Sequence, residues 1–156
     1  MVPPPSGRGG SPIPTVGFKA DLGGVHVYVV DDNEDARQLL SEVLEYCGAL
    51  VHLSTNAEDA LCDLAQFLPT VVICDLALPG VDGFTFIRML RKLPKKRGGL
   101  LPAIAISAHY EDFSRPEALR LGFNEYLQKP LDLHQLCATL TRLIRTNELT
   151  ATETLG

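Results

Sequence analysis

The order in which apolar segments follow one another is the feature of this sequence that most limits its fold. Five segments have the length of strands, at residues 25–30, 50–53, 71–74, 103–106 and 125–128. After each of them, apolar residues recur every three or four positions, which predicts helices over 34–47, 57–64, 84–90, part of 112–121 and 133–144. Strands that alternate with helices over short connections predict a parallel sheet with helices on both faces.

Single residues mark where several of the expected helices begin or end. Asn56 is a residue type that caps helix N-termini, because its side chain accepts a hydrogen bond from an unpaired backbone N–H group. Gly48 ends the first helical pattern. Pro116 is tolerated in the first turn of a helix, so the fourth helix is expected to begin near Arg115.

Length and composition indicate one globular domain. The chain has 156 residues, of which 46% are hydrophobic, and this suffices for one sizeable core. Its net charge of −5 gives no general attraction to nucleic acid or to an anionic membrane. No apolar stretch has the length of a membrane span, and the N-terminus lacks the apolar core of a signal peptide. We therefore expect a cytoplasmic protein that contacts neither nucleic acid nor membrane directly.

The cysteines also indicate a reducing environment. They lie far apart, form no C-x-x-C pair and fall within apolar patterns, at Cys47, Cys62, Cys74 and Cys137. Buried free thiols are therefore expected rather than disulfides or metal ligands.

The composition divides the chain into a folded centre and two tails. Eleven of the first 24 residues are Gly or Pro, which is typical of a disordered tail or linker over residues 1–24. Residues 146–156 are polar and show no apolar pattern, so a flexible C-terminal tail is expected there. The folded domain is predicted to span residues 25–145.

Two adjacent carboxylates, Asp31 and Asp32, follow the first predicted strand. Such like charges repel each other and resist burial. With Glu34 and Asp35 there are four acids within five residues. A hard cation held between them would make this arrangement favourable, and Mg²⁺ is the leading candidate because it prefers oxygen ligands.

Three further polar residues end later strands of the predicted sheet. Asp75 ends the third strand, Ser107 the fourth and Lys129 the fifth. Ligands of parallel α/β sheets bind at the carboxyl ends of the strands. These residues are therefore expected to lie at the same edge of the sheet as the acidic pair.

This set of residues resembles the receiver domain of two-component response regulators. The matching segments are Asp31-Asp32, residues 75–83, Ser107-Ala108 and Lys129-Pro130, in this order and at strand ends. The resemblance covers about residues 25–144, and the stretch 98–107 is also similar to receivers of hybrid sensor histidine kinases. It implies a flavodoxin-like, doubly wound (βα)₅ three-layer sandwich with a five-stranded parallel sheet.

The resemblance also implies a role for each residue of the set. Asp75 is the nucleophile and phosphoacceptor, which becomes an aspartyl phosphate. Lys129 and Ser107 contact the phosphoryl oxygens, Lys129 as a mobile point charge. The ligands of Mg²⁺, or of Mn²⁺ in its place, are Asp31, Asp32, Asp75 and the backbone carbonyl of Ala77. Of the adjacent pair, Asp32 is the expected direct ligand.

Ser107 and Tyr126 are the residues of the expected switch. In the family, an aromatic residue on the fifth strand turns inward when the hydroxyl moves toward the phosphoryl group, and Tyr126 occupies this position. The surface that changes is the face of the fourth helix, fifth strand and fifth helix. Two variable positions, Ala77 and His109, border the route of the attacking water, and we hypothesise that His109 sets the rate of dephosphorylation.

The function that follows is that of a signalling module rather than an enzyme that acts on an external substrate. Its phosphodonor is a histidine kinase or a histidine phosphotransfer protein, and it slowly hydrolyses its own aspartyl phosphate. No output domain is visible after the last helix, so we expect a stand-alone regulator or a receiver cut from a hybrid kinase. The downstream partner stays open, as does the formation of a homodimer.

Three other interpretations are open from the sequence. A flavodoxin-like cofactor-binding protein has the same topology, but the acidic loop 31–35 would repel the phosphate of its cofactor. A phosphatase with an aspartate nucleophile commonly carries a D-x-D pattern after a strand, which is absent here. A receiver that only binds partners would not need the complete set of acids, hydroxyl and lysine.

Overall fold

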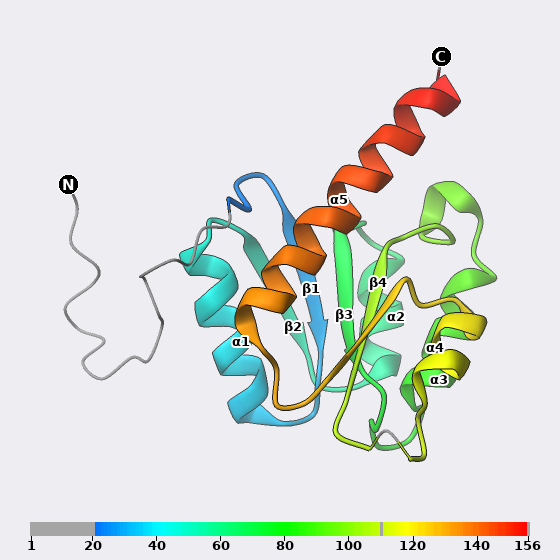
Figure 1. Ribbon diagram of the computed structural model, residues 1–156. Helices are drawn as coiled ribbons and strands as arrows, with labels where there is room; N and C mark the ends of the chain where they lie inside the picture. The colour runs from blue at the N-terminus through cyan, green and yellow to red at the C-terminus, as the bar shows by residue number, and fades with distance from the viewer. Residues whose placement is uncertain (1–20, 110, 156) are drawn as a thin grey trace, which may run out of the picture.

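The computed structural model describes residues 21–109 and 111–155 and contains a five-stranded parallel sheet between two layers of helices (Figure 1). The strands are β1 (His26–Val30), β2 (Leu50–Ser54), β3 (Val71–Asp75), β4 (Ala103–Ser107) and β5 (Glu125–Gln128). The helices are α1 (Glu34–Tyr46), α2 (Ala57–Leu64), α3 (Gly83–Arg91), α4 (Arg115–Leu121) and α5 (Leu133–Leu155), with a short 3₁₀ helix η1 (Lys95–Arg97) after α3. The strand order is β2-β1-β3-β4-β5, which confirms the predicted (βα)₅ fold.

Alternating side chains of the central strands fill a separate core on each face of the sheet. On β1, Val27 and Val29 are fully buried in the core that α1 and α5 cover. Tyr28 and Val30 are fully buried in the opposite core, beneath α2, α3 and α4. Consecutive side chains of a strand point to opposite faces, so a strand covered on both faces is a continuous apolar run. Charged residues are therefore confined to the strand ends.

The expected helix starts are confirmed by the capping contacts. The side-chain oxygen of Asn56 accepts a hydrogen bond from the backbone N–H of Asp59 at 2.7 Å, at the start of α2. Helix α4 begins at Arg115, with Pro116 in its first turn. Both residues act locally, which is why the sequence pattern could place these ends.

The folded domain begins earlier than predicted. Leu22 is only 1% exposed and packs in the core beneath α1 and α5, and its backbone N–H donates to the carbonyl of Cys47 at 2.8 Å. Residues 21–24 are therefore packed against the domain, although the composition assigned them to the tail. The rest of that predicted tail, residues 1–20, lies outside the described residues.

The last helix is longer than predicted. Helix α5 continues to Leu155 instead of ending near Arg145, and its last turns project beyond the rest of the domain (Figure 1). Residues 146–155 contain neither Gly nor Pro, so nothing in them breaks a helix. Apolar periodicity appears only where a helix covers a core, and this segment extends past the core. The flexibility expected for residues 146–156 stays a prediction.

Three of the four cysteines are buried free thiols, as expected, but Cys62 is exposed. Helix α2 buries Ala57, Ala60 and Leu64, and position 62 lies outside this stripe. Among the helices of the described residues, none combines the length and apolarity needed to cross a membrane.

Arg91, the last residue of α3, connects two loops at the edge of the sheet where β4 and β5 begin. Its Nε donates to the carbonyl of Gly122 at 2.9 Å, and its Nη1 donates to the carbonyl of Leu101 at 2.7 Å. Its Nη2 donates to the side-chain oxygen of Asn124 at 3.1 Å. Burial lowers the pKa of Arg91. One partly buried cation thus satisfies acceptors from two separate loops.

We expect Arg91→Met to lower the free energy of unfolding by about 2–4 kcal/mol, because hydrogen bonds to charged donors contribute about 1.5–3 kcal/mol each and the acceptors would lose their partner. Urea denaturation followed by circular dichroism measures this. Arg88→Met, at an exposed position of the same helix, is the control and should change the free energy by at most about 0.5 kcal/mol. Equal effects of the two substitutions would show that the Arg91 contacts do not stabilise the fold.

Candidate functional site

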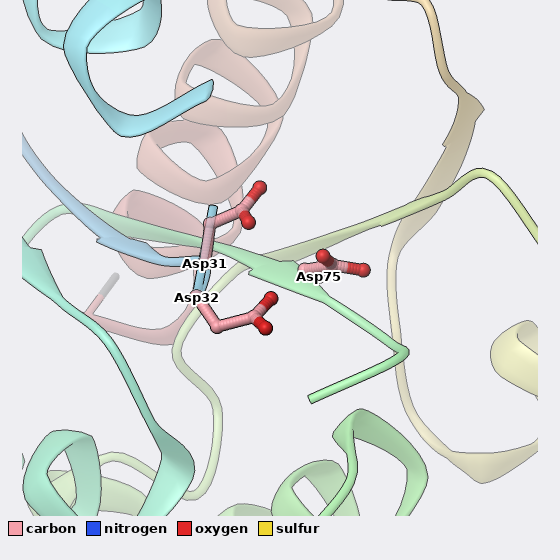
Figure 2. A group of neighbouring side chains, drawn as sticks. All are labelled: Asp31, Asp32 and Asp75. Carbon is pink, nitrogen blue, oxygen red and sulfur yellow. The ribbon is translucent and has the colours of Figure 1, made fainter. Parts of the chain in front are cut away.

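Three carboxylates from two neighbouring strands meet at the carboxyl edge of the sheet. Asp31 and Asp32 directly follow β1, and Asp75 is the last residue of β3. Because β1 and β3 pair in parallel, with Val30 opposite Cys74, their ends lie side by side. One oxygen atom from each of the three carboxylates lies within 4.8 Å of the other two (Figure 2). The fold thus brings together residues that are more than 40 positions apart in the chain.

Lys129 bridges the two buried carboxylates of this group. It follows β5, and its Nζ donates to Asp31 Oδ2 at 2.9 Å and to Asp75 Oδ2 at 3.2 Å. Asp31 is fully buried, and Asp75 is 6% exposed. The repulsion between two buried anions is therefore offset by one cation within hydrogen-bond distance of both.

The remaining oxygen of each buried carboxylate accepts a backbone hydrogen bond. Asp31 Oδ1 accepts from the N–H of Asn33 at 2.9 Å, and Asp75 Oδ1 accepts from the N–H of Ala77 at 3.1 Å. Asp32 differs from both, because it is exposed and its carboxylate has no hydrogen bond or ion pair within the described part of the chain. The three acids are thus two fixed anions and one that is open to solvent.

Burial and neighbouring charges shift the pKa values of this site in a consistent way. Burial raises the pKa of the Asp75 carboxyl; the charge of Lys129 lowers it in part, and the charge of Asp31 raises it again. Burial alone would lower the pKa of Lys129, but its hydrogen bonds and charge contacts with Asp31 and Asp75 outweigh burial, so this pKa is raised. Lys129 is therefore a firmly protonated cation, whereas Asp75 is held as an anion at a cost in free energy.

One residue of α1 and one of α3 contact the segments that carry Asp31 and Asp75. The Nη1 of Arg37 donates to the backbone carbonyl of Asp31 at 2.8 Å, which ties the loop after β1 to α1. A Cβ on Gly83 would lie 2.6 Å from Leu76 Cδ2 and 3.0 Å from the carbonyl oxygen of Asp75. Only glycine allows α3 to begin so close to the end of β3. Arg37 has no distinctive signal in the sequence, since a lone cation on an amphipathic helix is ordinary.

Ser107 is the last residue of β4, the strand that pairs with β3, and Tyr126 lies on β5. Ser107 is fully buried, its Oγ accepts from the N–H of His109 at 2.9 Å, and its carbonyl accepts from the N–H of Lys129 at 2.9 Å. Tyr126 is 7% exposed, and its hydroxyl donates to the carbonyl of Phe113 at 2.7 Å. The tyrosine ring therefore lies inside the domain, and its hydroxyl is bound to the loop that precedes α4.

The raised pKa of Asp75 leads to a prediction about stability. Above its ordinary value of 3.8 the carboxyl ionises more readily in the unfolded chain than in the folded one, so the folded state loses relative stability as the pH rises. In metal-free buffer at pH 7, Asp75→Asn is therefore expected to unfold at a higher urea concentration than the wild type. The difference should shrink as the pH falls toward 3.8, where both states become protonated.

The exposed Asp35 provides the matched control, and Asp35→Asn should give no such gain in stability. A lower stability of Asp75→Asn at pH 7 would contradict the prediction, since the pairing with Lys129 would then outweigh the effect of burial.

Comparison with known proteins places this arrangement in a family. A curated relative is the uncharacterized 14.6 kDa protein in the sodA1 3′ region of Leptolyngbya boryana, which is 46% identical over 111 residues, or 71% of this chain and 83% of that protein. The DNA-binding transcriptional regulator NtrC of Salmonella typhimurium is 31% identical over 118 residues, or 76% of this chain, but the match spans only 24% of NtrC.

A solved structure shares both the fold and part of the sequence. The crystal structure of a two-component response regulator from Clostridium difficile superposes with a TM-score of 0.71 and 26% identity, over 78% of this chain and 96% of that one. The family model of the response regulator receiver domain matches residues 27–141, which include all the site residues described above. The chain therefore belongs to the response regulator receiver domain family.

Proposed function

We propose that this receiver domain accepts a phosphoryl group from a phosphohistidine onto Asp75, in a reaction that depends on Mg²⁺. The observation that carries the proposal is the position of Asp75, whose carboxylate lies beside two further carboxylates and a lysine at the open edge of the sheet. Phosphoryl transfer depends mainly on positioning and on neutralisation of charge. The arrangement supplies both around one nucleophile.

The donor set fits a hard divalent cation. Three carboxylates offer oxygen atoms within 4.8 Å of one another, and oxygen ligands suit Mg²⁺, or Mn²⁺ in its place. Asp31, Asp32, Asp75 and the backbone carbonyl of Ala77 would hold the ion. Asp32 is the best direct ligand of the adjacent pair, because Asp31 is already bonded to Lys129 and to the N–H of Asn33. The bound ion would neutralise charge on the carboxylates and on the phosphoryl oxygens.

In the transfer step, a carboxylate oxygen of Asp75 attacks phosphorus. The new P–O bond forms as the P–N bond of the phosphohistidine breaks, and the bonding electron pair stays on the imidazole nitrogen. Lys129 would exchange its contact with Asp75 for the phosphoryl oxygens, which its flexible side chain permits. Ser107 would donate its hydroxyl hydrogen to the same group, since its Oγ acts as an acceptor toward His109.

The same contacts define the proposed switch. A movement of Ser107 toward a phosphoryl group would shift the segment after β4, because Ser107 Oγ holds the N–H of His109. This segment leads to Phe113, whose carbonyl accepts the hydrogen bond of Tyr126. Tyr126 is buried already, so the proposed response is a change in its contacts with the loop. The altered surface would be that of α4, β5 and α5.

The partners follow from this chemistry. The phosphodonor would be a histidine kinase or a histidine phosphotransfer protein, and the readout would be a downstream protein or a second copy in a homodimer. The chain would act in the cytoplasm, as a signalling module that catalyses only its own phosphorylation and dephosphorylation, without direct contact to nucleic acid or membrane. It would serve as a stand-alone regulator or as the receiver of a hybrid kinase.

Mass spectrometry tests the phosphoryl transfer directly. After incubation with acetyl phosphate and Mg²⁺, the wild-type protein should gain the mass of one phosphoryl group, and the gain should disappear with EDTA. Asp75→Asn should not gain this mass, since its amide is a poor nucleophile. Asp32→Asn should lose most of the gain, whereas Asp35→Asn, at an exposed acid in the first turn of α1, should retain it. Absence of a gain in the wild type, together with absence of beryllofluoride binding, would favour a receiver that only binds partners.

The lifetime of the phosphoryl group tests the role of His109. His109 is exposed and lies two residues after Ser107, at the border of the route by which water would attack. We expect His109→Ala to change the decay rate of the labelled phosphoprotein by about threefold or more, which corresponds to roughly 0.7 kcal/mol in the barrier. An unchanged decay rate would mean that His109 does not influence the attacking water. His134→Ala, on α5, is the control.

A further inference from the structure

An apolar surface lies between α2 and α3, away from the carboxylates. It is a groove of about 560 Å³ at the C-terminal ends of the two helices. Its apolar walls are formed by Leu61, Leu64, Phe67, Leu68, Met89 and Leu93. Leu68 and Met89 are each 46% exposed, so the apolar surface continues onto the rim of the groove. An exposed apolar concavity of this kind is typical of a binding surface.

Two cations line this groove, and neither has an acidic partner in the part of the chain that the structure describes. Lys96 and Arg97 of η1 line it, and Lys92 and Lys95 belong to the same run. None of these four residues forms an ion pair with a carboxylate of residues 21–109 or 111–155. The chain as a whole carries a net charge of −5. An uncompensated positive rim on an acidic protein favours an acidic ligand.

We propose that this groove, which we call the α2–α3 groove, binds an acidic amphipathic helix of a partner protein. The walls are side chains of α2, of α3 and of the segments that directly follow them, and no strand is among the lining residues, so an added β-strand would find no backbone partners. An amphipathic helix would place its apolar residues in the groove and its Asp or Glu residues against Lys96 and Arg97. This combines an apolar centre with a charged rim, as in other protein interfaces.

Charge and shape argue against the other occupants. Residues 1–20 of this chain contain Arg8 and Lys19 and no acidic residue, so the positive rim would repel them. Membrane-binding surfaces insert apolar side chains into the bilayer from a convex face, whereas here most of the apolar side chains form the walls of a concavity. A partner helix is therefore the occupant that the contacts favour.

Binding in this groove would be independent of phosphorylation. Helices α2 and α3 run back from the carboxyl ends of β2 and β3, so their C-terminal ends lie at the opposite edge of the sheet from Asp75. None of the residues that line the groove belongs to the carboxylate site. Asp75→Asn should therefore bind the same helix with unchanged affinity, and failure of one proposal would leave the other intact.

Fluorescence anisotropy with labelled peptides and the full-length protein tests the proposal. The probes are a synthetic amphipathic helix of Leu and Glu and a counterpart of Leu and Lys. The Leu/Glu peptide should bind, more weakly at higher salt, and the Leu/Lys peptide should not. The double variant Lys96→Glu with Arg97→Glu should weaken binding by about tenfold or more, because like charges that face each other cost several kcal/mol.

Two further variants separate charge from apolar contact. Arg142→Glu with Arg145→Glu makes the same change in net charge on α5, which covers the other face of the sheet, and it should not alter binding. Met89→Gln removes apolar surface from the rim at a position that is 46% exposed and compatible with folding, and it should weaken binding. Circular dichroism confirms that each variant is folded.

Three outcomes would overturn the proposal. The first is equal binding of the two peptides, or binding that survives Lys96→Glu with Arg97→Glu. The second is binding of vesicles of phosphatidylserine and phosphatidylcholine that this double variant abolishes, without peptide binding, which would assign the surface to a membrane. The third is self-association in sedimentation velocity that the double variant abolishes, again without peptide binding, which would assign it to a second copy of this chain.

Discussion

The ion pairs of Lys129 with Asp31 and Asp75 are the interaction on which the rest of the site depends. The two carboxylates are buried at neighbouring strand ends. Because like charges repel, the negative charge of each one disfavours the ionised form of the other. Lys129 comes from β5, which is separated from β3 by β4, and its long side chain spans this distance to reach both carboxylates. The position of the nucleophile is thus coupled to the strand that carries Tyr126.

The location of the site is a consequence of how the core is filled. Because β1 and β3 are buried on both faces, a carboxylate can be tolerated only where a strand leaves the sheet. Gly83 lets the start of α3 pack closely against the end of β3, next to Asp75. Arg37 binds the carbonyl of Asp31 and so holds the loop after β1. The same packing places the C-terminal ends of α2 and α3 at the edge of the sheet opposite to the carboxylates. The fold therefore places the carboxylate site and the α2–α3 groove at opposite edges of the sheet.

Local signals in the sequence predicted much of the fold. The apolar runs and helical periods located all five strands and all five helices, and Asn56 and Pro116 placed two helix starts, because each acts on backbone groups within a few residues. The sequence pattern and the structure differ where the controlling contact is distant or absent. Leu22 belongs to the core through its contact with Cys47, and α5 continues past Arg145 although no apolar pattern accompanies it.

The sequence by itself placed Asp31, Asp32 and Asp75 at one edge of the sheet, because strand ends and acid pairs are local features. Only the tertiary structure decided how they are connected. Lys129 bonds to carboxylates that are 98 and 54 residues away, Asp32 stays exposed while its neighbour is buried, and Arg37 holds the Asp31 carbonyl. The groove between α2 and α3 likewise depends on helix packing. Such contacts follow from strand order and side-chain reach, which no spacing along the chain encodes.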